Sequence, residues 1–117
     1  MLSDAAIRAL RDMAYHIDLA ASFTTGLSFD TFRGDLRAVY AVTRCLEIIS
    51  EASRRLPDDL KARHPSIAWK EMAGAGSVYR HDYEEVDADE VWVTVQDHLP
   101  PLRTVVEHEL GLLDGAT

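Results

Sequence analysis

An arginine, a histidine and a tyrosine occur within four consecutive residues, as Arg80, His81 and Tyr83. A guanidinium is planar and permanently charged, so Arg80 is suited to hold a phosphate and to stabilise charge that develops on it. Histidine titrates near neutral pH, so His81 is suited to act as general base or general acid. Tyr83 adds a hydroxyl that could position a phosphate or a base. These three residues are therefore the candidate catalytic residues.

Each of the three side chains also has a purely structural interpretation. Arg80 could pair with neighbouring carboxylates, His81 could be a partly buried histidine bonded to a backbone group, and Tyr83 could be a core aromatic with a solvated hydroxyl. Acidic residues crowd this part of the chain and would repel phosphate unless they point away from it or a partner neutralises them. They are Asp82, Glu84, Glu85, Asp87, Asp89 and Glu90.

The net charge of −8 is unevenly distributed along the chain. Residues 1–70 hold ten basic and nine acidic residues, whereas residues 71–117 hold two basic and eleven acidic ones. Phosphate binding normally needs clustered lysine and arginine. Nucleic acid would therefore have to approach through the basic cluster before the candidate segment, or through a cleft between two subunits. The cluster consists of Arg54, Arg55, Lys61, Arg63 and Lys70.

The size and composition predict a single globular domain over residues 1–117. No apolar run of about 18 residues is present, and the N-terminus lacks the pattern of a secretory signal, so we expect a protein without a membrane span. A single cysteine, Cys45, fits a reducing cytoplasm and is interpreted as a core residue rather than a nucleophile.

The elements that must position the candidate residues are helices. Apolar residues at three-and-four spacing predict helices over residues 3–22, over 29–56 with a division at Gly34, over about 58–64, over 67–78, and from 87 onward. Strand alternation of convincing length is absent from the sequence. The fold class is therefore all-α, an up-and-down bundle of four to five helices.

Local signals set the expected helix ends and faces. Ser3, Asp35 and Asp87 are expected near or at helix N-termini, and Asp58 is expected to cap the short helix after Pro57. The prolines at 100 and 101 should bend or restart the last helix. The inward face of the long second helix is predicted to carry Leu36, Val39, Tyr40, Thr43, Leu46, either Ile49 or Ile48, and Leu56.

Several separated motifs resemble the HepT-like branch of the HEPN superfamily. The stretch from Leu46 to Ala52 reads LEIISEA and is similar to the family's LEIIGEA, with Ser50 in place of glycine. His81-Asp82-Tyr83 followed by Val86-Asp87 is similar to its HxY…VD. Further similarities, over about seventy residues together, are Leu56-Pro57, Trp69 with Met72, and VWVTV with DHLPPL at residues 91–95 and 97–102.

The resemblance implies an all-helical, HEPN-like toxin of a type VII-like toxin–antitoxin pair. Such a toxin is a metal-independent endoribonuclease in which the RNA 2′-hydroxyl attacks the adjacent phosphate. The resemblance further implies a nucleotidyltransferase-like antitoxin as partner, and it implies that this antitoxin attaches adenylate groups to Tyr83 and so blocks the site. It also implies a symmetric homodimer whose two sites face one cleft, with no cofactor and no metal.

The chain departs from the family pattern at its arginine. The usual motif has Arg five residues before His, often followed by Asn, but Gly76 and Ser77 occupy those positions here. Arg80 instead directly precedes His81, which resembles a variant group of the family. Residues one apart and five apart on a helix point in different directions, so Arg80 could reach the site only if the backbone is irregular there, as Gly74 and Gly76 permit.

Two other hypotheses remain open. A non-catalytic helical adaptor would keep the fold, dimerise and bind a nucleotidyltransferase partner without cleaving RNA. Helical bundles can also hold metals through Glu and Glu-x-x-His pairs. The acids at Glu47 and Glu51 and the Glu107-His108-Glu109 run offer no such pair at the right spacing, so metal catalysis is the weaker interpretation.

Overall fold

The computed structural model describes residues 2–74 and 87–115, and within these residues every regular element is helical. The long helices are α1 (Asp4–Thr24), α3 (Leu36–Arg54) and α7 (Leu99–Gly115). The short ones are α2 (Phe29–Gly34), α4 (Asp58–Ala62), α6 (Ala88–Val93) and a helical turn over residues 69–74. The predicted all-α bundle is confirmed.

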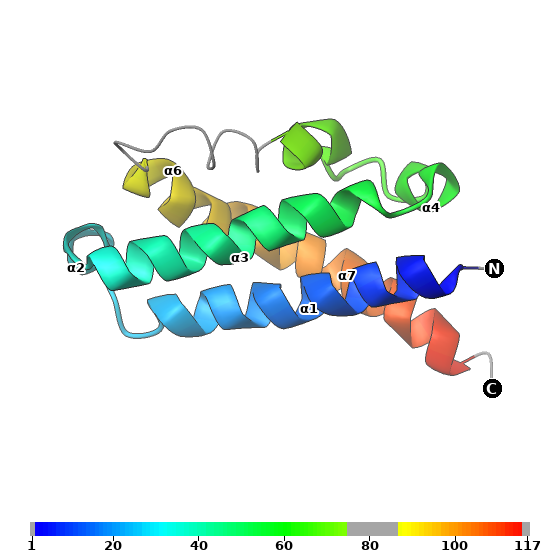
Figure 1. The fold of residues 1–117 in the computed structure, drawn as a ribbon, viewed down its shortest axis with the longest axis horizontal. Coiled ribbons are helices and arrows are strands. Elements are labelled where there is room, and N and C mark those ends of the chain that lie inside the picture. The colour runs from blue at the N-terminus through cyan, green and yellow to red at the C-terminus, as the bar shows by residue number, and fades with distance from the viewer. Residues whose placement is uncertain (1, 75–86, 116–117) are drawn as a thin grey trace.

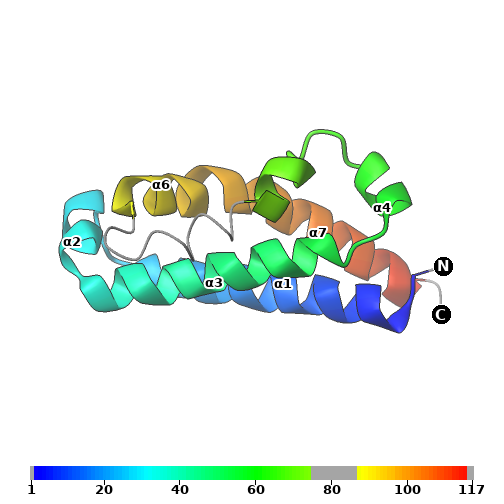
Figure 2. The same ribbon diagram turned by 45° about the horizontal axis from the view of Figure 1, so that its top comes forward.

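The long helices lie along one another (Figure 1). Helix α1 runs antiparallel to α3, and α6 and α7 together form a third rod that runs in the same direction as α3. The chain therefore has to return along the bundle between α3 and α6. Helix α4 and residues 69–74 belong to this return and lie over α3 on the side facing α7 (Figure 2).

Side-chain caps define the helix starts as the sequence predicts. The Ser3 hydroxyl accepts a hydrogen bond from the Ala6 N–H at 3.1 Å. Asp35 accepts from the first N–H groups of α3, and Asp87 does the same for α6. After α1 the chain turns at Gly26, whose φ of 79° lies in the left-handed region that only glycine enters without cost.

Helix α4 begins differently from the prediction. Asp58 is its first helical residue rather than its cap, and the cap position is occupied by Pro57, which makes no side-chain bond there. Proline fixes φ near the value that the preceding turn needs and has no N–H to satisfy. The carboxylates of Asp58 and Asp59 then lie in the first turn, where the helix dipole favours negative charge.

The last helical rod accommodates two prolines through a π-helical turn and stays continuous. Between α6 and α7 the residues Thr94–His98 form a π-helical turn, labelled η1, in which the Leu99 N–H reaches the carbonyl of Thr94, five residues back. Pro100 and Pro101 follow as part of α7. The two prolines have no N–H to donate to carbonyls in the preceding turn. A π turn shifts the backbone hydrogen-bond pattern by one residue just before them.

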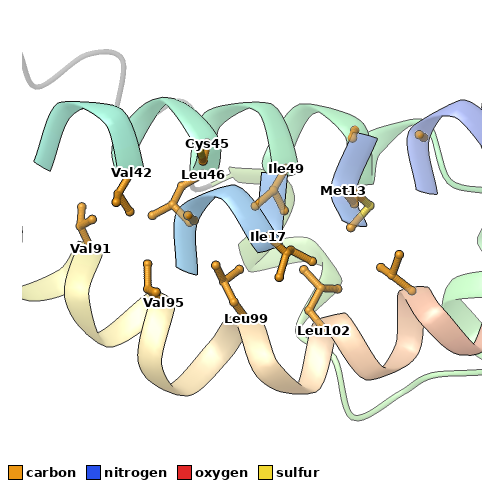
Figure 3. Close-up of a cluster of buried hydrophobic side chains, with 14 of the residues drawn as sticks. Met13, Ile17, Val42, Cys45, Leu46, Ile49, Val91, Val95, Leu99 and Leu102 are labelled. Atoms are coloured by element: carbon orange, nitrogen blue, oxygen red, sulfur yellow. The ribbon is translucent and has the colours of Figure 1, made fainter. Parts of the chain in front are cut away.

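The core runs along the axis between the three rods (Figure 3). Met13 and Ile17 of α1 meet a row of α3 side chains, and a stripe from α6, η1 and α7 closes the third side. The α3 row is Val42, Cys45, Leu46 and Ile49, and the third stripe is Val91, Val95, Leu99, Leu102 and Val106. Cys45 is a buried core residue, as predicted, and burial raises the pKa of its thiol.

The predicted inward face of α3 was too wide. Leu36 and Tyr40 are 66% and 59% exposed, whereas Val39, Leu46 and Ile49 are buried as expected. Thr43 is also buried, and its hydroxyl donates to the Val39 carbonyl at 2.7 Å. Neighbouring rods approach α3 on the Val39 side, and Leu36 and Tyr40 are left on its solvent side.

Trp92 fixes the short helix α2 to the rest of the bundle. Its ring lies 5.3 Å from that of the fully buried Phe32 and 6.2 Å from that of Phe29, centroid to centroid. Aromatic pairs at this spacing add to the stabilisation that comes from burial alone. Trp92 is therefore a packing residue that joins α2 to α6.

Among the helices of residues 2–74 and 87–115, none combines the length and apolarity that crossing a bilayer requires.

Candidate functional site

The three predicted catalytic residues, Arg80, His81 and Tyr83, lie outside the described residues, as do Gly76 and Ser77. The same holds for residues 75–78, the last part of the helix predicted over residues 67–78. Their assignment therefore stays a prediction from the sequence. The described residues do define what surrounds both ends of this segment.

A pocket of about 750 Å³ lies next to those ends. Met72, shortly before the segment, and Asp89, shortly after it, both line the pocket. Its lining is mostly apolar and comes from α3, residues 67–72, α6 and α7. The apolar lining residues are Leu46, Ile49, Ile67, Ala68, Met72, Val93, Leu99, Pro101 and Leu102. Ligand sites of this size are typically apolar with a few polar groups, so this is the candidate functional site of the described part.

The polar groups of the pocket lie mostly at its rim. The side chains of Glu71, Asp89 and Glu90 line the pocket and are exposed, and so is that of His98. Within the described residues no ion pair is formed by these three carboxylates. The pocket mouth is thus acidic, in keeping with the acidic second half of the sequence.

Helix α3 holds the backbone that leads into the candidate segment. The Ser50 hydroxyl lies 2.8 Å from the carbonyl oxygen of Met72 and 3.2 Å from that of Ala73. Arg54 donates to the Ala73 carbonyl through Nε at 2.9 Å and through Nη2 at 2.6 Å. These bonds satisfy carbonyls at the end of a helical turn, which otherwise have no partner in the helix. Ser50 is the residue that stands where the resembling motif has glycine.

Trp69 adds a second tether to the same stretch. Its indole N–H donates to the carbonyls of Lys61 and His64, at 3.1 and 3.0 Å. The half-buried ring thereby joins the end of α4 to the start of the turn over residues 69–74. Backbone on the N-terminal side of the candidate segment is therefore fixed by α3 and by α4 together.

Most of the predicted basic cluster is engaged within the chain. Arg54 binds the Ala73 carbonyl, Arg55 pairs with Asp12 at 3.3 Å, and Arg63 pairs with Glu109 at 2.7 Å. Lys61 and Lys70 have no ion-pair partner among the described residues. The cluster is consequently a weaker phosphate-binding surface than its sequence suggests.

A buried carboxylate of α7 joins this helix to the two residues that follow α4. Glu109 is only 2% exposed, and its two oxygens accept from Arg63 at 2.7 Å and from His64 Nε2 at 2.7 Å. Burial by itself raises the pKa of Glu109, but the hydrogen bonds and positive charge of Arg63 and His64 outweigh it and hold the pKa below its ordinary value. His64 also contacts the ring of His108 edge-on, with 5.8 Å between centroids.

The sequence contains one signal for this network. Glu109 follows the buried Val106 by three residues and precedes the half-buried Leu110, so an acid occupies the edge of the apolar stripe. A buried acid needs a cationic partner. Its partners lie 45 and 46 residues earlier in the chain, and a helical pattern cannot identify them.

No group of three or more His, Cys, Asp or Glu side chains within residues 2–74 and 87–115 is arranged to hold a metal ion. Glu109 of the Glu107-His108-Glu109 run is committed to Arg63 and His64, and Glu47 pairs with Arg44 at 3.3 Å.

Comparison with known proteins identifies the family. The model of the family described as ribonuclease HepT-like matches residues 13–109. A protein of Thermococcus cleftensis named as the probable ribonuclease HepT is 42% identical over 94 residues, which cover 80% of this chain and 86% of that protein. A protein of Methanocaldococcus jannaschii named as a candidate RNase is 32% identical over 106 residues, covering 91% and 88%.

A third relative comes from a bacterium, Caldanaerobacter subterraneus subsp. tengcongensis. It is also named as a candidate RNase and is 35% identical over 85 residues, which cover 73% of this chain and 76% of the relative. No solved structure matches the chain significantly. The family match covers most of the chain and includes the segment with Arg80, His81 and Tyr83. The chain therefore belongs to the ribonuclease HepT-like family.

Proposed function

We propose that the protein is a metal-independent endoribonuclease and the toxin half of a type VII-like toxin–antitoxin pair. The observation that carries this proposal is the family match over residues 13–109, because it spans the segment that contains the candidate catalytic residues. The RNase names of the relatives support the same reaction class. RNA is the substrate under this proposal.

The candidate residues fit cleavage by the neighbouring 2′-hydroxyl. In this reaction the 2′-oxygen forms a bond to phosphorus while the bond from phosphorus to the 5′-oxygen breaks. His81 accepts the proton of the 2′-hydroxyl or donates one to the departing 5′-oxygen. Arg80 holds the phosphate and stabilises its added charge, and Tyr83 positions the phosphate or a base.

A homodimer would complete the site. One chain offers few unpaired cations beside the candidate segment, since Arg54, Arg55 and Arg63 are engaged internally. Two chains related by a two-fold axis would bring two copies of Arg80 and His81 to one cleft. The two Arg80 guanidinium groups would then act on one RNA backbone from both sides of the cleft.

Cleavage of a labelled structured RNA in EDTA tests the reaction class. Wild-type protein is expected to cut the RNA without added metal, since both proton transfer and charge stabilisation come from side chains. The Arg80→Ala variant is expected to lose cleavage, because no arginine occupies position 76 to replace it. Cleavage that requires Mg²⁺, or an Arg80→Ala protein with full activity, would contradict the proposed mechanism.

We further propose that a nucleotidyltransferase-like antitoxin silences the protein by attaching adenylate to Tyr83. Incubation with this partner and ATP is expected to add adenylate mass to the wild type and none to the Tyr83→Phe variant, as measured on the intact protein. Tyr79→Phe is the matched control, since it removes a phenol from the same segment. An adduct that persists in Tyr83→Phe and disappears in Tyr79→Phe would assign the modification to the other tyrosine.

A non-catalytic adaptor is the second candidate function. It is favoured by the acidic mouth of the pocket and by the absence of an arginine at position 76. Under this alternative a folded dimer binds the nucleotidyltransferase partner and cleaves no RNA. The cleavage experiment in EDTA therefore separates the two functions.

A further inference from the structure

We infer that an exposed stripe on α3, made of Leu36, Arg37, Tyr40 and Arg44, binds single-stranded RNA. Tyr40 would stack against a base, and the two arginines would bind phosphates on either side of that base. The inference rests on the proposed function, because that function makes RNA the substrate. It assigns a surface that holds RNA without taking part in the cleavage step.

The first argument is the exposure of two large apolar side chains on this stripe. Leu36 is 66% exposed and Tyr40 is 59% exposed. Residues four apart on a helix are neighbours on its surface, so these two side chains lie together. Among the described residues, none of the aromatic or cation–π contacts involves the Tyr40 ring. The ring is therefore open to a ligand with a flat face, such as a base.

The second argument is that cations flank the ring along the helix. Arg37 precedes Tyr40 by three positions and Arg44 follows it by four, so the three side chains leave the same side of α3. Arg37 has no ion-pair partner among the described residues. Arg44 pairs with Glu47 at 3.3 Å, but its side chain is 67% exposed, and exposed pairs of this kind are weak. Both guanidinium groups can therefore bind a phosphate from solvent.

An exposed tyrosine on α1 shows what distinguishes this stripe. Tyr15 is 64% exposed, and Arg11 lies one turn before it. Asp12 and Asp18, however, lie three positions before and after Tyr15, and its ring contacts that of His16 edge-on, with 5.1 Å between centroids. A base stacked on Tyr15 would bring phosphates toward two carboxylates, which repel them. The charges beside the ring, and not its exposure alone, therefore favour the stripe on α3.

The stripe lies on the helix that holds the backbone leading into the candidate catalytic segment. Arg54 donates to the Ala73 carbonyl, just before that segment begins. Tyr40 and Arg54 are fourteen residues apart, nearly four turns, so they lie on the same side of α3 and about 21 Å apart along its axis. A single strand of a few nucleotides can span this distance. RNA bound along the stripe would therefore extend toward the candidate segment.

A protein partner matches this stripe less well than RNA does. Protein interfaces usually have an apolar centre from which charged residues are depleted. Here arginines alternate with the two apolar side chains, so the stripe has no continuous apolar centre. Cations beside an exposed aromatic ring instead match the way in which proteins bind single strands, by stacking on bases and pairing with phosphates. A second copy of this chain and an acidic protein are tested below as alternative occupants.

Binding of an RNA that cannot be cleaved tests this inference. The probe is a fluorescein-labelled single strand of about ten nucleotides with 2′-O-methyl groups throughout, which removes the attacking hydroxyl. Anisotropy is expected to show micromolar binding by the wild type and about tenfold weaker binding by Tyr40→Ala, through loss of stacking. In Arg37→Ala/Arg44→Ala, the slope of log affinity against log salt concentration is expected to become less steep by about 1.4, since each phosphate contact contributes about 0.7.

Matched controls on α1 separate the stripe from a general change of surface. Tyr15→Ala removes a similarly exposed phenol. Arg8→Ala/Arg11→Ala removes two exposed cations that have no ion pair among the described residues. Both proteins are expected to bind the probe like the wild type, and so is Tyr40→Phe, which keeps the ring. Circular dichroism of each variant establishes that it is folded before binding is measured.

Several outcomes would overturn the inference. These are a wild type that does not bind the probe, equal weakening in Tyr15→Ala, and equally tight binding of a duplex RNA, whose paired bases cannot stack on Tyr40. Displacement of the probe by polyglutamate as effectively as by unlabelled RNA would indicate an acidic protein as the occupant. If Tyr40→Ala converts a wild-type dimer to monomer in sedimentation, the stripe is a subunit interface.

The cleavage experiment in EDTA separates this inference from the proposed function. A wild type that cleaves RNA while Tyr40→Ala binds the probe normally would refute the stripe and leave the nuclease in place. A wild type that binds the probe through Tyr40 but cleaves no RNA would support the stripe and refute the nuclease.

Discussion

The His81→Ala protein is expected to cleave RNA about 10²–10⁴-fold more slowly than the wild type, the usual cost of removing a general acid or base. His81 is the one side chain of the candidate set that can exchange a proton readily near neutral pH. The rate is to be measured in EDTA with enzyme in excess over RNA, so that chemistry rather than product release is observed. Growth of cells that express the variant should likewise no longer be inhibited.

The matched control for this experiment is His16→Ala. His16 is half-buried on α1 and its Nδ1 lies 2.7 Å from the Asp12 carbonyl oxygen of the same helix, far in sequence from the candidate segment. Its loss should leave the cleavage rate unchanged. A His81→Ala protein that is folded and still cuts RNA at the wild-type rate would remove His81 from the mechanism.

The Glu109→Gln protein is expected to lose about 3 kcal/mol of unfolding free energy at pH 7. The substitution preserves the shape of the side chain but removes the carboxylate charge that pairs with Arg63, and it turns an amide N–H₂ toward one of the two donors. Chemical denaturation followed by circular dichroism at 222 nm measures this loss. Such a loss is a large share of the stability of a small domain.

The effect of this substitution should depend on pH with a definite sign. The pKa of Glu109 in the folded protein lies below its ordinary value of 4.5, so the folded state binds its proton more weakly than the unfolded chain does. The carboxylate therefore contributes its full stability above about pH 4.5 and loses it as the pH falls through the lower folded pKa. The difference between wild type and Glu109→Gln should shrink in that acidic range.

Glu107→Gln provides the comparison for Glu109. Glu107 lies two residues away on the same helix, is half exposed, and pairs with Arg103 at 2.8 Å at the surface. Exposed pairs of this kind contribute little, so no measurable change is expected at any pH. Equal losses of unfolding free energy in the two variants would mean that burial of Glu109 contributes nothing to stability.

The helix starts were predictable because they depend on neighbours in the sequence. Ser3 and Asp35 cap the N–H groups of residues two or three positions later, and a local pattern contains all that this requires. The width of a helix face is different, because it depends on which other helices approach. The apolar spacing correctly predicted that Val39 and Leu46 are buried. It also predicted that Tyr40 faces inward, whereas Tyr40 is exposed to solvent.

The site was predictable only in part, for the same physical reason. The types and order of Arg80, His81 and Tyr83 suggest a reaction class, and the family match supports that class without testing the individual residues. The tether from Ser50 and Arg54 to residues 72–73 crosses about twenty positions of sequence. Contacts between residues so far apart in the sequence depend on tertiary packing. The periodicity of apolar residues carries no information about them.

The π turn between α6 and α7 gives this helix an unusual tolerance to changes in length. Its hydrogen bond from the Leu99 N–H to the Thr94 carbonyl encloses one residue more than an α-helical bond does. Relatives that lack one residue within 94–98 could therefore keep a regular α-helix with Val91 and Leu102 still facing the core. A deletion elsewhere in the rod would rotate everything beyond it by about 100° and turn the apolar stripe away from α1 and α3.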